Sequence, residues 1–152
     1  MGHSRATEHP DQPIQVGIGL IRRGDCFLVR QRPPETVYAG YWEFPGGKCE
    51  PAEDPAQATA RECFEETGLT VVVGPLRLVT TYRYPHGVVE LFFHDCTTLL
   101  HQSEPAAGSG FRWVKAADLA ALRFPEANEA VIEQLASKSG QWSVNSGRWG
   151  RP

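Results

Sequence analysis

An α/β sandwich built on a mixed β-sheet is the fold class that this sequence predicts. Strand-like segments come first, one well-delimited helical segment follows them, and further strand-like segments lead to a second helix. Alternation of this kind places helices against the faces of a sheet. With 152 residues and 41% hydrophobic content, the chain can build one sizeable core. We therefore expect one domain at 14–136, between flexible polar tails at 1–13 and 137–152.

The strands expected ahead of the helix form a hairpin and a short third strand. Residues 14–21 are rich in β-forming side chains, and 22–25 have the composition of a turn that leads into the apolar run at 26–30. The next segment, 32–48, contains several prolines and glycines and is predicted to be a long loop with a short strand at 41–44. A loop of this length in a compact domain is usually functional.

A helix is predicted over 56–67. Asp54 provides its N-cap, Pro55 starts its first turn, and Gly68 ends it. The remaining expected elements are strands at 71–84 and 88–98 around a turn at 85–87, a loop at 101–110, a strand at 111–114, a helical turn at 117–122 and a final helix at about 125–136.

The composition argues against several classes of function. A net charge of −3 gives no general attraction to a nucleic-acid polymer or an acidic membrane surface. The first residues contain no apolar core of a signal peptide, and no segment approaches the roughly 18 to 20 apolar residues of a membrane span. The four cysteines are widely spaced without a CxxC pair, so reduced thiols are expected. We expect a soluble, cytoplasmic protein.

The predicted helix has an acidic face. On a helical wheel, the side expected to anchor the helix carries Ala56, Ala60, Cys63, Phe64 and Thr67, and the opposite side carries Glu62, Glu65 and Glu66. Most acidic helix faces are simply solvated. Glu62 and Glu66, however, are like charges one turn apart, which costs a few tenths of a kcal/mol, and only Arg61 is close enough to offset this. The unfavourable pairing favours a functional reason for the cluster.

Clustered carboxylates suit a divalent metal ion. Mg²⁺ and Mn²⁺ bridge carboxylates to phosphate oxygens and can activate a bound water. Just before the helix, Gly46 and Gly47 let the backbone approach a ligand closely, and Lys48 offers a point charge to a phosphate. The segment therefore predicts metal-dependent chemistry on a phosphate compound.

The spacing of these residues resembles the Nudix box. The matching polar and glycine positions are Gly47, Glu53, Arg61, Glu62, Glu65, Glu66 and Gly68. Two positions depart from the pattern: Cys63 stands where a bulky aliphatic residue is usual, and Ala52 stands where glycine commonly precedes the first glutamate. So many fixed positions at fixed spacing make this a specific signal.

The resemblance implies a Nudix α/β/α sandwich and an enzyme that cuts a phosphoanhydride bond with Mg²⁺, for which Mn²⁺ can substitute. Its metal ligands would be Glu62, Glu65 and Glu66, with the Gly46 carbonyl as a further candidate. Arg61 would orient the glutamates, and Glu53 would support the loop or the metal shell. One carboxylate would instead serve as the base for the attacking water, and the sequence leaves open which.

Beyond the box, residues 15–135 resemble the MutT branch of the family, which hydrolyses oxidised purine nucleotides such as 8-oxo-dGTP to the monophosphate and pyrophosphate. The resemblance is carried by the motifs at 27–32, 42–48 and 124–129. It implies that Arg32, Phe44 and Asn128 contact the base, and that Gly47 and Lys48 contact the phosphates. An asparagine amide can pair with both the O6 acceptor and the N7–H donor of 8-oxoguanine.

Each expected base contact also has a structural alternative. Asn128 could satisfy the backbone at a helix start, Phe44 could belong to the core, and Arg32 could be a surface cation. The motif around Asn128 favours base recognition.

Two departures from the MutT pattern bear on the substrate. His86 and Gly87 replace more polar residues in the turn over the nucleotide pocket. Ala107 stands where the branch has an additional catalytic glutamate, which Glu104 in the same loop could replace. Other Nudix branches act on modified cytidine triphosphates, dinucleotides or ADP-ribose. A nucleotide-sensing domain without turnover is the alternative of a different class, and the intact box argues against it. Whether the protein is a monomer or a homodimer stays open.

Overall fold

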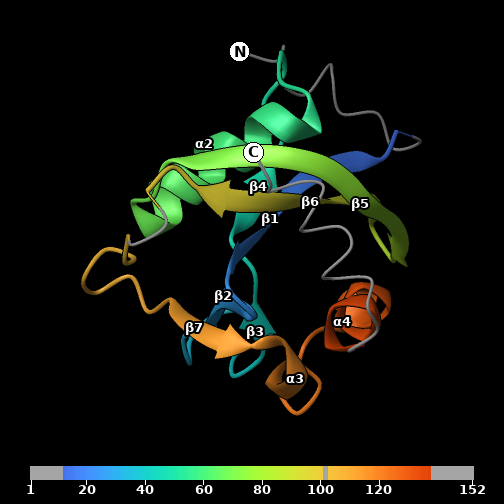
Figure 1. Ribbon diagram of the computed structural model, residues 1–152. Helices are drawn as coiled ribbons and strands as arrows, with labels where there is room; N and C mark the ends of the chain where they lie inside the picture. Colours follow the sequence, from blue (N-terminus) through green and yellow to red (C-terminus); the bar gives the residue numbers. More distant parts are fainter. Residues whose placement is uncertain (1–11, 101–102, 138–152) are drawn as a thin grey trace.

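A computed structural model of the chain describes residues 12–100 and 103–137 (Figure 1). The tails predicted at 1–13 and 137–152 therefore lie almost entirely outside the described residues, and the domain boundaries stay predictions. No helix in the described ranges has the length and apolar character that a membrane span requires.

In the described part of the chain, seven strands form one mixed sheet. Their bounds are β1 (Ile14–Arg23), β2 (Cys26–Gln31), β3 (Trp42–Glu43), β4 (Gly46–Lys48), β5 (Val71–Tyr84), β6 (Gly87–Thr98) and β7 (Arg112–Lys115). The order along the sheet is β3-β2-β1-β6-β5, with β4 paired to β1 and β7 paired to β2. The β1–β6 pair is parallel, and the other pairs are antiparallel. The prediction of a mixed sheet is confirmed.

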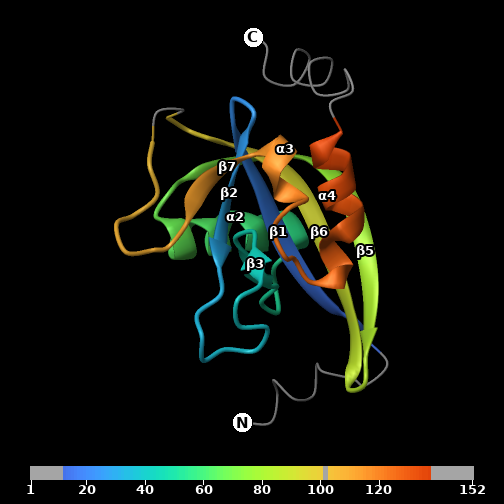
Figure 2. The same ribbon diagram turned by 90° about the horizontal axis from the view of Figure 1, so that it is seen from below.

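Helices cover both faces of this sheet. Their bounds are α2 (Pro55–Thr67), α3 (Ala116–Leu119) and α4 (Glu129–Ala136), with a 3₁₀ turn at Glu126–Asn128. Figure 1 shows α2 on one face, with α3 and α4 on the other, and Figure 2 shows α4 running across β6 and β5. Each face has its own cluster of buried apolar side chains. The predicted α/β/α sandwich is therefore confirmed.

Helix α2 begins and ends where the sequence predicts. Asp54 accepts a hydrogen bond from the Gln57 backbone at 2.8 Å, and the Gln57 side chain accepts one from the Asp54 backbone at 2.9 Å. These reciprocal bonds form a capping box that satisfies two otherwise orphaned backbone donors. At the other end, Gly68 is left-handed with φ of 80°, a conformation that costs glycine nothing.

Two glycines on β1 let α2 lie unusually close to the sheet. A Cβ on Gly17 would sit 2.3 Å from the Pro55 carbonyl oxygen, and a Cβ on Gly19 would sit 2.5 Å from the Cys63 sulfur. Both distances are far below van der Waals contact. A small side chain at Cys63 therefore fits this fold, because a bulky aliphatic residue would meet the strand at Gly19.

The rotation of α2 differs from the prediction. Phe64, expected on the anchoring side, is 55% exposed, whereas Ala58 and Thr59 are fully buried. On the helical wheel, Glu62 and Glu66 fall between Ala58 and Thr59. These two carboxylates therefore lie within the buried arc and not opposite to it. The prediction was wrong because it assumed that the most hydrophobic residues of α2 are buried. The glycines of β1 instead favour small α2 residues at the contact between the helix and the sheet.

Two other elements also differ from the predicted ones. Residues 46–48 were predicted as loop, but they form β4 and pair with 16–18 of β1, and Cys49 continues the contact by donating to the Gln15 carbonyl at 2.9 Å. This pairing depends on a distant strand, which local propensity does not reveal. The last helix begins at Glu129 and not at Pro125, because a 3₁₀ turn comes first, with the Asn128 N–H bonded to the Pro125 carbonyl at 2.9 Å.

The glycine contact predicts a difference between two alanine substitutions. We expect Gly17→Ala and Gly19→Ala each to lower the free energy of unfolding by about 1–3 kcal/mol, because each forces overpacking. Adding Cys63→Ala should rescue Gly19→Ala, since the sulfur is the atom in the way. Adding Thr59→Ala should not rescue Gly17→Ala, since the Pro55 backbone carbonyl remains. Urea unfolding of the four variants measures this, and equal rescue at both sites would contradict the packing account.

Candidate active site

The site forms where β4 and α2 meet over β1. Gly47 pairs with Gly17 on β1, and α2 packs on the same stretch of that strand. A Cβ on Gly47 would lie 2.4 Å from a carboxylate oxygen of Glu62. The missing side chain therefore makes the space in which the Glu62 carboxylate lies directly against the backbone of β4.

Arg61 is the centre of a network that joins this helix to the preceding loop. Its guanidinium donates to Glu53 at 2.6 and 2.9 Å, to Glu62 at 3.1 Å and to Glu65 at 3.3 Å. It also donates to the Lys48 backbone carbonyl at 3.1 Å. The forked donor of arginine suits such multiple contacts better than lysine would. One cation therefore fixes three carboxylates and the end of β4.

Glu53 is the strongest partner of Arg61. Hydrogen bonds from Arg61, and a further one from the Glu50 backbone N–H at 2.9 Å, lower the pKa of Glu53 to about 2. The same pairing raises the pKa of Arg61 above its usual value. The Glu53–Arg61 pair therefore stays fully ionised at neutral pH and clamps the loop at 50–53 to α2.

Glu66 lies in a different electrostatic environment. Its carboxylate accepts a hydrogen bond from the Gly46 backbone N–H at 3.2 Å, and it lies outside the hydrogen-bond network of Arg61. Burial raises the pKa of Glu66 to about 7, and the nearby Glu62 acts in the same direction. The Gly46 N–H and Arg30 oppose this shift without cancelling it. A positive charge beside Glu66 and Glu62 would therefore be strongly favoured.

The donor set fits a divalent metal ion. Glu62 and Glu66 place hard oxygen donors beside the Gly46–Gly47 backbone, and the nearby Arg30 only partly offsets the effect of burial on Glu66. Glu65 is more open, with 55% of its side chain exposed. In the described residues no three acidic side chains are already gathered as a metal site, so the three predicted ligands are not brought together in advance. Mg²⁺ usually keeps several waters and is bound through one or two carboxylates together with substrate phosphates, which suits this donor set.

The residues predicted to contact the base come from different parts of the fold, and only Phe44 belongs to the buried cluster that includes α4 residues. Arg32 donates to Glu43 at 2.7 Å and to the Val37 carbonyl at 2.6 Å. Glu43 also binds Arg30 at 2.8 Å, so this carboxylate, which sequence analysis did not single out, ties two arginines together. A signal for it existed, because Glu43 lies inside the motif at 42–48.

Phe44 is largely a core residue. Its side chain is only 6% exposed, and its ring stacks on Phe124 at 5.1 Å and meets Phe93 edge-on at 6.5 Å. The Phe44–Phe124 stack joins the short link between β3 and β4 to the segment that carries Asn128. A contact between Phe44 and a base stays a prediction, and packing is the role that the described contacts support.

Asn128 does not cap helix α4, although it stands at the N-cap position. Its side-chain NH₂ donates instead to the Pro125 carbonyl at 3.3 Å. Within the described residues its amide oxygen has no hydrogen-bond partner. The side chain therefore satisfies a backbone carbonyl at the helix start, as the structural alternative expects, while its amide oxygen remains able to accept a hydrogen bond from a ligand.

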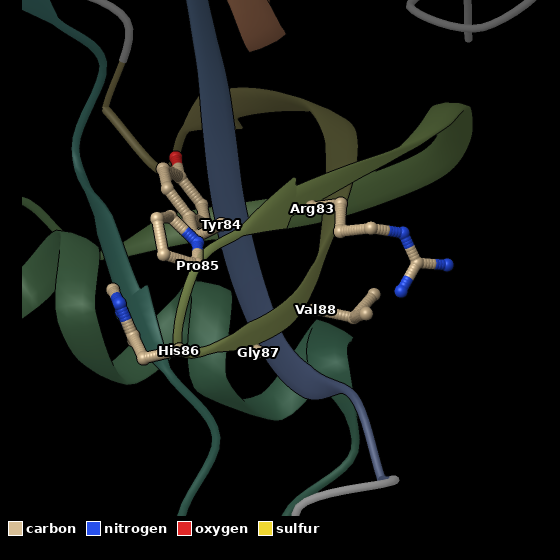
Figure 3. A pocket seen from close by; sticks show the side chains of 6 residues that line it. All are labelled: Arg83, Tyr84, Pro85, His86, Gly87 and Val88. Atoms are coloured by element: carbon tan, nitrogen blue, oxygen red, sulfur yellow. The ribbon is translucent and has the colours of Figure 1, made fainter.

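Two further features lie away from the acidic site. Glu104, the possible substitute for a catalytic glutamate, pairs with Arg23 at 2.7 Å. A hollow at the tip of the β5–β6 hairpin is lined by residues 83–88 (Figure 3). This hollow contains none of the predicted site residues, so it is not the centre of the chemistry.

Comparison with known proteins identifies the family. A family model described as a NUDIX domain matches residues 17–134. The chain belongs to the Nudix hydrolase family. The matched region contains β4, the 49–54 loop and α2, which together form the Nudix box at 47–69.

Individual relatives agree with this family. The 8-oxo-dGTP diphosphatase of Haemophilus influenzae is 33% identical over 83% of this chain and 93% of its own. A solved MutT structure from methicillin-resistant Staphylococcus aureus 252 is 27% identical, with a TM-score of 0.67 over 83% of this chain and 97% of that one. The CTP pyrophosphohydrolase of Escherichia coli is 46% identical, but over only 40% of this chain and 45% of its own.

The raised pKa of Glu66 predicts how pH changes the stability of the metal-free Nudix domain. The folded pKa of about 7 exceeds the ordinary value of 4.5, so folding favours the protonated form. The stability that this group contributes is complete below about pH 4.5 and is lost as the pH rises through about 7. In chelator, Glu66→Gln should therefore be more stable than the wild type at pH 8, by about 1–2 kcal/mol, and equally stable near pH 4.5.

With added metal at pH 8, the wild type should become more stable than Glu66→Gln, because the wild type binds the ion more tightly. Glu65→Gln, on the exposed part of the same helix, is the matched control in chelator and should unfold like the wild type. Thermal melts at the two pH values provide the measurement. A Glu66→Gln variant that is less stable than the wild type at pH 8 in chelator would contradict the burial effect.

Proposed function

We propose that this Nudix hydrolase is a MutT-type nucleoside triphosphate pyrophosphohydrolase, which converts oxidised purine nucleotides such as 8-oxo-dGTP to the monophosphate and pyrophosphate. The observation that carries the proposal is the cluster of carboxylates around Arg61 and Gly46. These carboxylates lie beside the glycine backbone of β4, where a phosphate could come close to the chain. Relatives named as 8-oxo-dGTP diphosphatases support the substrate class.

Mg²⁺, or Mn²⁺ in its place, is the cofactor that we assign. Its ligands would be Glu62, Glu65 and Glu66, with the Gly46 carbonyl as a further candidate. When bound, such an ion stabilises negative charge on phosphate oxygens and lowers the pKa of water. Gly47 and Lys48 would face the phosphate chain, where the absence of a side chain allows contact and the lysine adds a positive charge.

The residues of the chain have distinct roles in this reaction. Water forms a new bond to phosphorus, a carboxylate takes its proton, and the anhydride bond between the α- and β-phosphates breaks, so that the monophosphate and pyrophosphate separate. Attack at the α- or the β-phosphorus gives the same products. Arg61 contacts Glu62 and Glu65 while Glu53 holds Arg61, so this pair keeps both carboxylates close to the place where the metal would bind.

Base selection would take place at the other end of the substrate. We assign it to Asn128, with Arg32 and Phe44 shaping the pocket. The free amide oxygen of Asn128 can accept the N7–H of 8-oxoguanine, and its NH₂ can leave the 3.3 Å bond to Pro125 and donate to O6. Guanine has an acceptor at N7, so it would oppose the same oxygen.

We also propose that the protein works in the cytoplasm on free nucleotides, without a nucleic-acid polymer or a membrane, as a monomer or homodimer. Removal of oxidised nucleotides before they reach DNA would make it part of nucleotide-pool sanitation and DNA repair. A second candidate substrate is a cytidine triphosphate, favoured by the 46% identity to the CTP pyrophosphohydrolase over part of the chain. A panel of canonical and oxidised nucleotides separates the two substrates.

The metal assignment predicts that chelation abolishes hydrolysis of every nucleotide. Glu65→Gln should keep the fold and lower kcat by roughly 10²-fold or more, because charge stabilisation is usually the largest catalytic contribution. Glu50→Gln is the matched control, since its carboxylate is 63% exposed and 3.7 Å from Arg61, and it should stay close to wild-type activity. Near-normal turnover by Glu65→Gln at saturating metal would exclude Glu65 from the site.

The base assignment predicts a change in substrate preference. Asn128→Ala should lower kcat/KM for 8-oxo-dGTP by about one to two powers of ten and change that for dGTP much less. Only the oxidised base has an N7–H, which loses its hydrogen bond to the Asn128 amide oxygen. Glu129→Ala, at the next and exposed position, is the control. Equal loss for both nucleotides would make Asn128 structural, and a wild type that prefers CTP would favour the second candidate.

A further inference from the structure

One residue outside the Nudix box has an unusual backbone conformation. Tyr38, in the loop between β2 and β3, has φ of 62°, and in the described residues every other positive φ belongs to a glycine. Left-handed conformations are strained for tyrosine and persist only where their surroundings hold them. Such strain often marks a functional position. Tyr38 is also 42% exposed, so burial of its ring does not account for the strain.

The loop that carries Tyr38 is well defined. The Arg32 N–H donates to the Tyr41 carbonyl at 2.7 Å, and the Gly40 N–H donates back to the Arg32 carbonyl at 3.2 Å. The Tyr41 N–H donates to the Tyr38 carbonyl at 3.0 Å. Together with the Arg32 side-chain bond to Val37, these contacts close the loop and hold Tyr38 in its strained state.

The ring of Tyr38 belongs to an aromatic group near the predicted base pocket. It meets Tyr41 edge-on at 5.3 Å, and the guanidinium of Arg123 lies 4.8 Å from the Tyr41 ring. Arg123 directly precedes Phe124, which stacks on Phe44. The loop is thus connected, contact by contact, to the segment that leads to Asn128.

A second aromatic pair approaches the same segment from β5. Tyr82 and Tyr84 are 4.6 Å apart, and the Tyr82 hydroxyl donates to Glu126 at 3.1 Å. Figure 2 shows the β2–β3 loop and the β5–β6 hairpin toward the same end of the molecule, and Figure 3 shows the Tyr84 ring beside Pro85 and His86. The hydrogen bond with Glu126 raises the pKa of Tyr82 and burial raises the pKa of Tyr84, and the nearby Tyr38 adds a smaller electrostatic contribution to both.

We propose that Tyr38 is a base-binding residue, whose ring stacks on the nucleobase and holds it between the β2–β3 loop and the Tyr82–Tyr84 pair. The inference rests on the proposed function, because it places a nucleotide with its base near Asn128. Aromatic rings bind any base through its π-face, and a purine offers the larger surface. Tyr38 then supplies affinity for a base, while Asn128 distinguishes one base from another.

The test is calorimetric binding of 8-oxo-dGMP, dGMP, CMP and deoxyribose 5-phosphate to the Mg²⁺-loaded protein. Tyr38→Ala should weaken binding of the best-bound monophosphate about tenfold, within the range measured for stacking on one base, and leave deoxyribose 5-phosphate unchanged. Tyr38→Phe should bind like the wild type, since it keeps the ring. Val37→Ala, at the adjacent 73% exposed position, is the matched control and should also bind normally.

A glycine substitution separates stacking from structure. Tyr38→Gly relieves the backbone strain, so its melting temperature should equal or exceed that of the wild type while base binding falls as in Tyr38→Ala. The inference is overturned if Tyr38→Ala binds every monophosphate normally, if it weakens deoxyribose 5-phosphate equally, or if the wild type binds no base more tightly than the bare sugar phosphate. A preference for CMP together with a loss in Tyr38→Ala would refute the oxidised-purine assignment and support the stacking role.

Discussion

The close contact between α2 and β1 is the constraint on which the rest of the site depends. Because Gly17 and Gly19 have no side chains, the helix comes near enough for Glu62 and Glu66 to reach the backbone of β4. The same contact selects small residues on the buried arc of α2 and explains why cysteine at 63 is compatible with the Nudix fold. The residues of α2 that pack on β1 and the two glutamates that reach β4 therefore lie on the same side of the helix.

Electrostatics divides the acidic residues of the site into two groups. Arg61 lowers the pKa of Glu53 and contacts Glu62 and Glu65, so one cation holds these three carboxylates. Glu66 is half-buried without such a partner, and its pKa is raised to about 7. The protein thus leaves a concentrated negative charge beside β4, which is the physical condition for binding a divalent ion and, through it, a phosphate chain.

The region assigned to the base is built differently from the acidic region. Phe44 and Phe124 join β3's end to the segment before α4, and Arg32 is held by Glu43 and by its own loop. Glu43 also binds Arg30, and both act electrostatically on Glu66, so this carboxylate couples the Arg32 loop to the box. The contacts of Phe44, Phe124 and Asn128 come from elements outside α2, so base selection can vary among relatives that share the box.

The sequence alone predicted the helix at 56–67 with its N-cap and its glycine stop, the mixed-sheet sandwich and the resemblance to the Nudix family, because capping, strand pattern and motif spacing are local properties. Only the tertiary structure decided which side of α2 is buried, that 46–48 is a strand, and that Phe44 packs in the core. It also showed Tyr38 in a left-handed conformation. These features depend on contacts between residues far apart in the chain, which sequence periodicity cannot reveal.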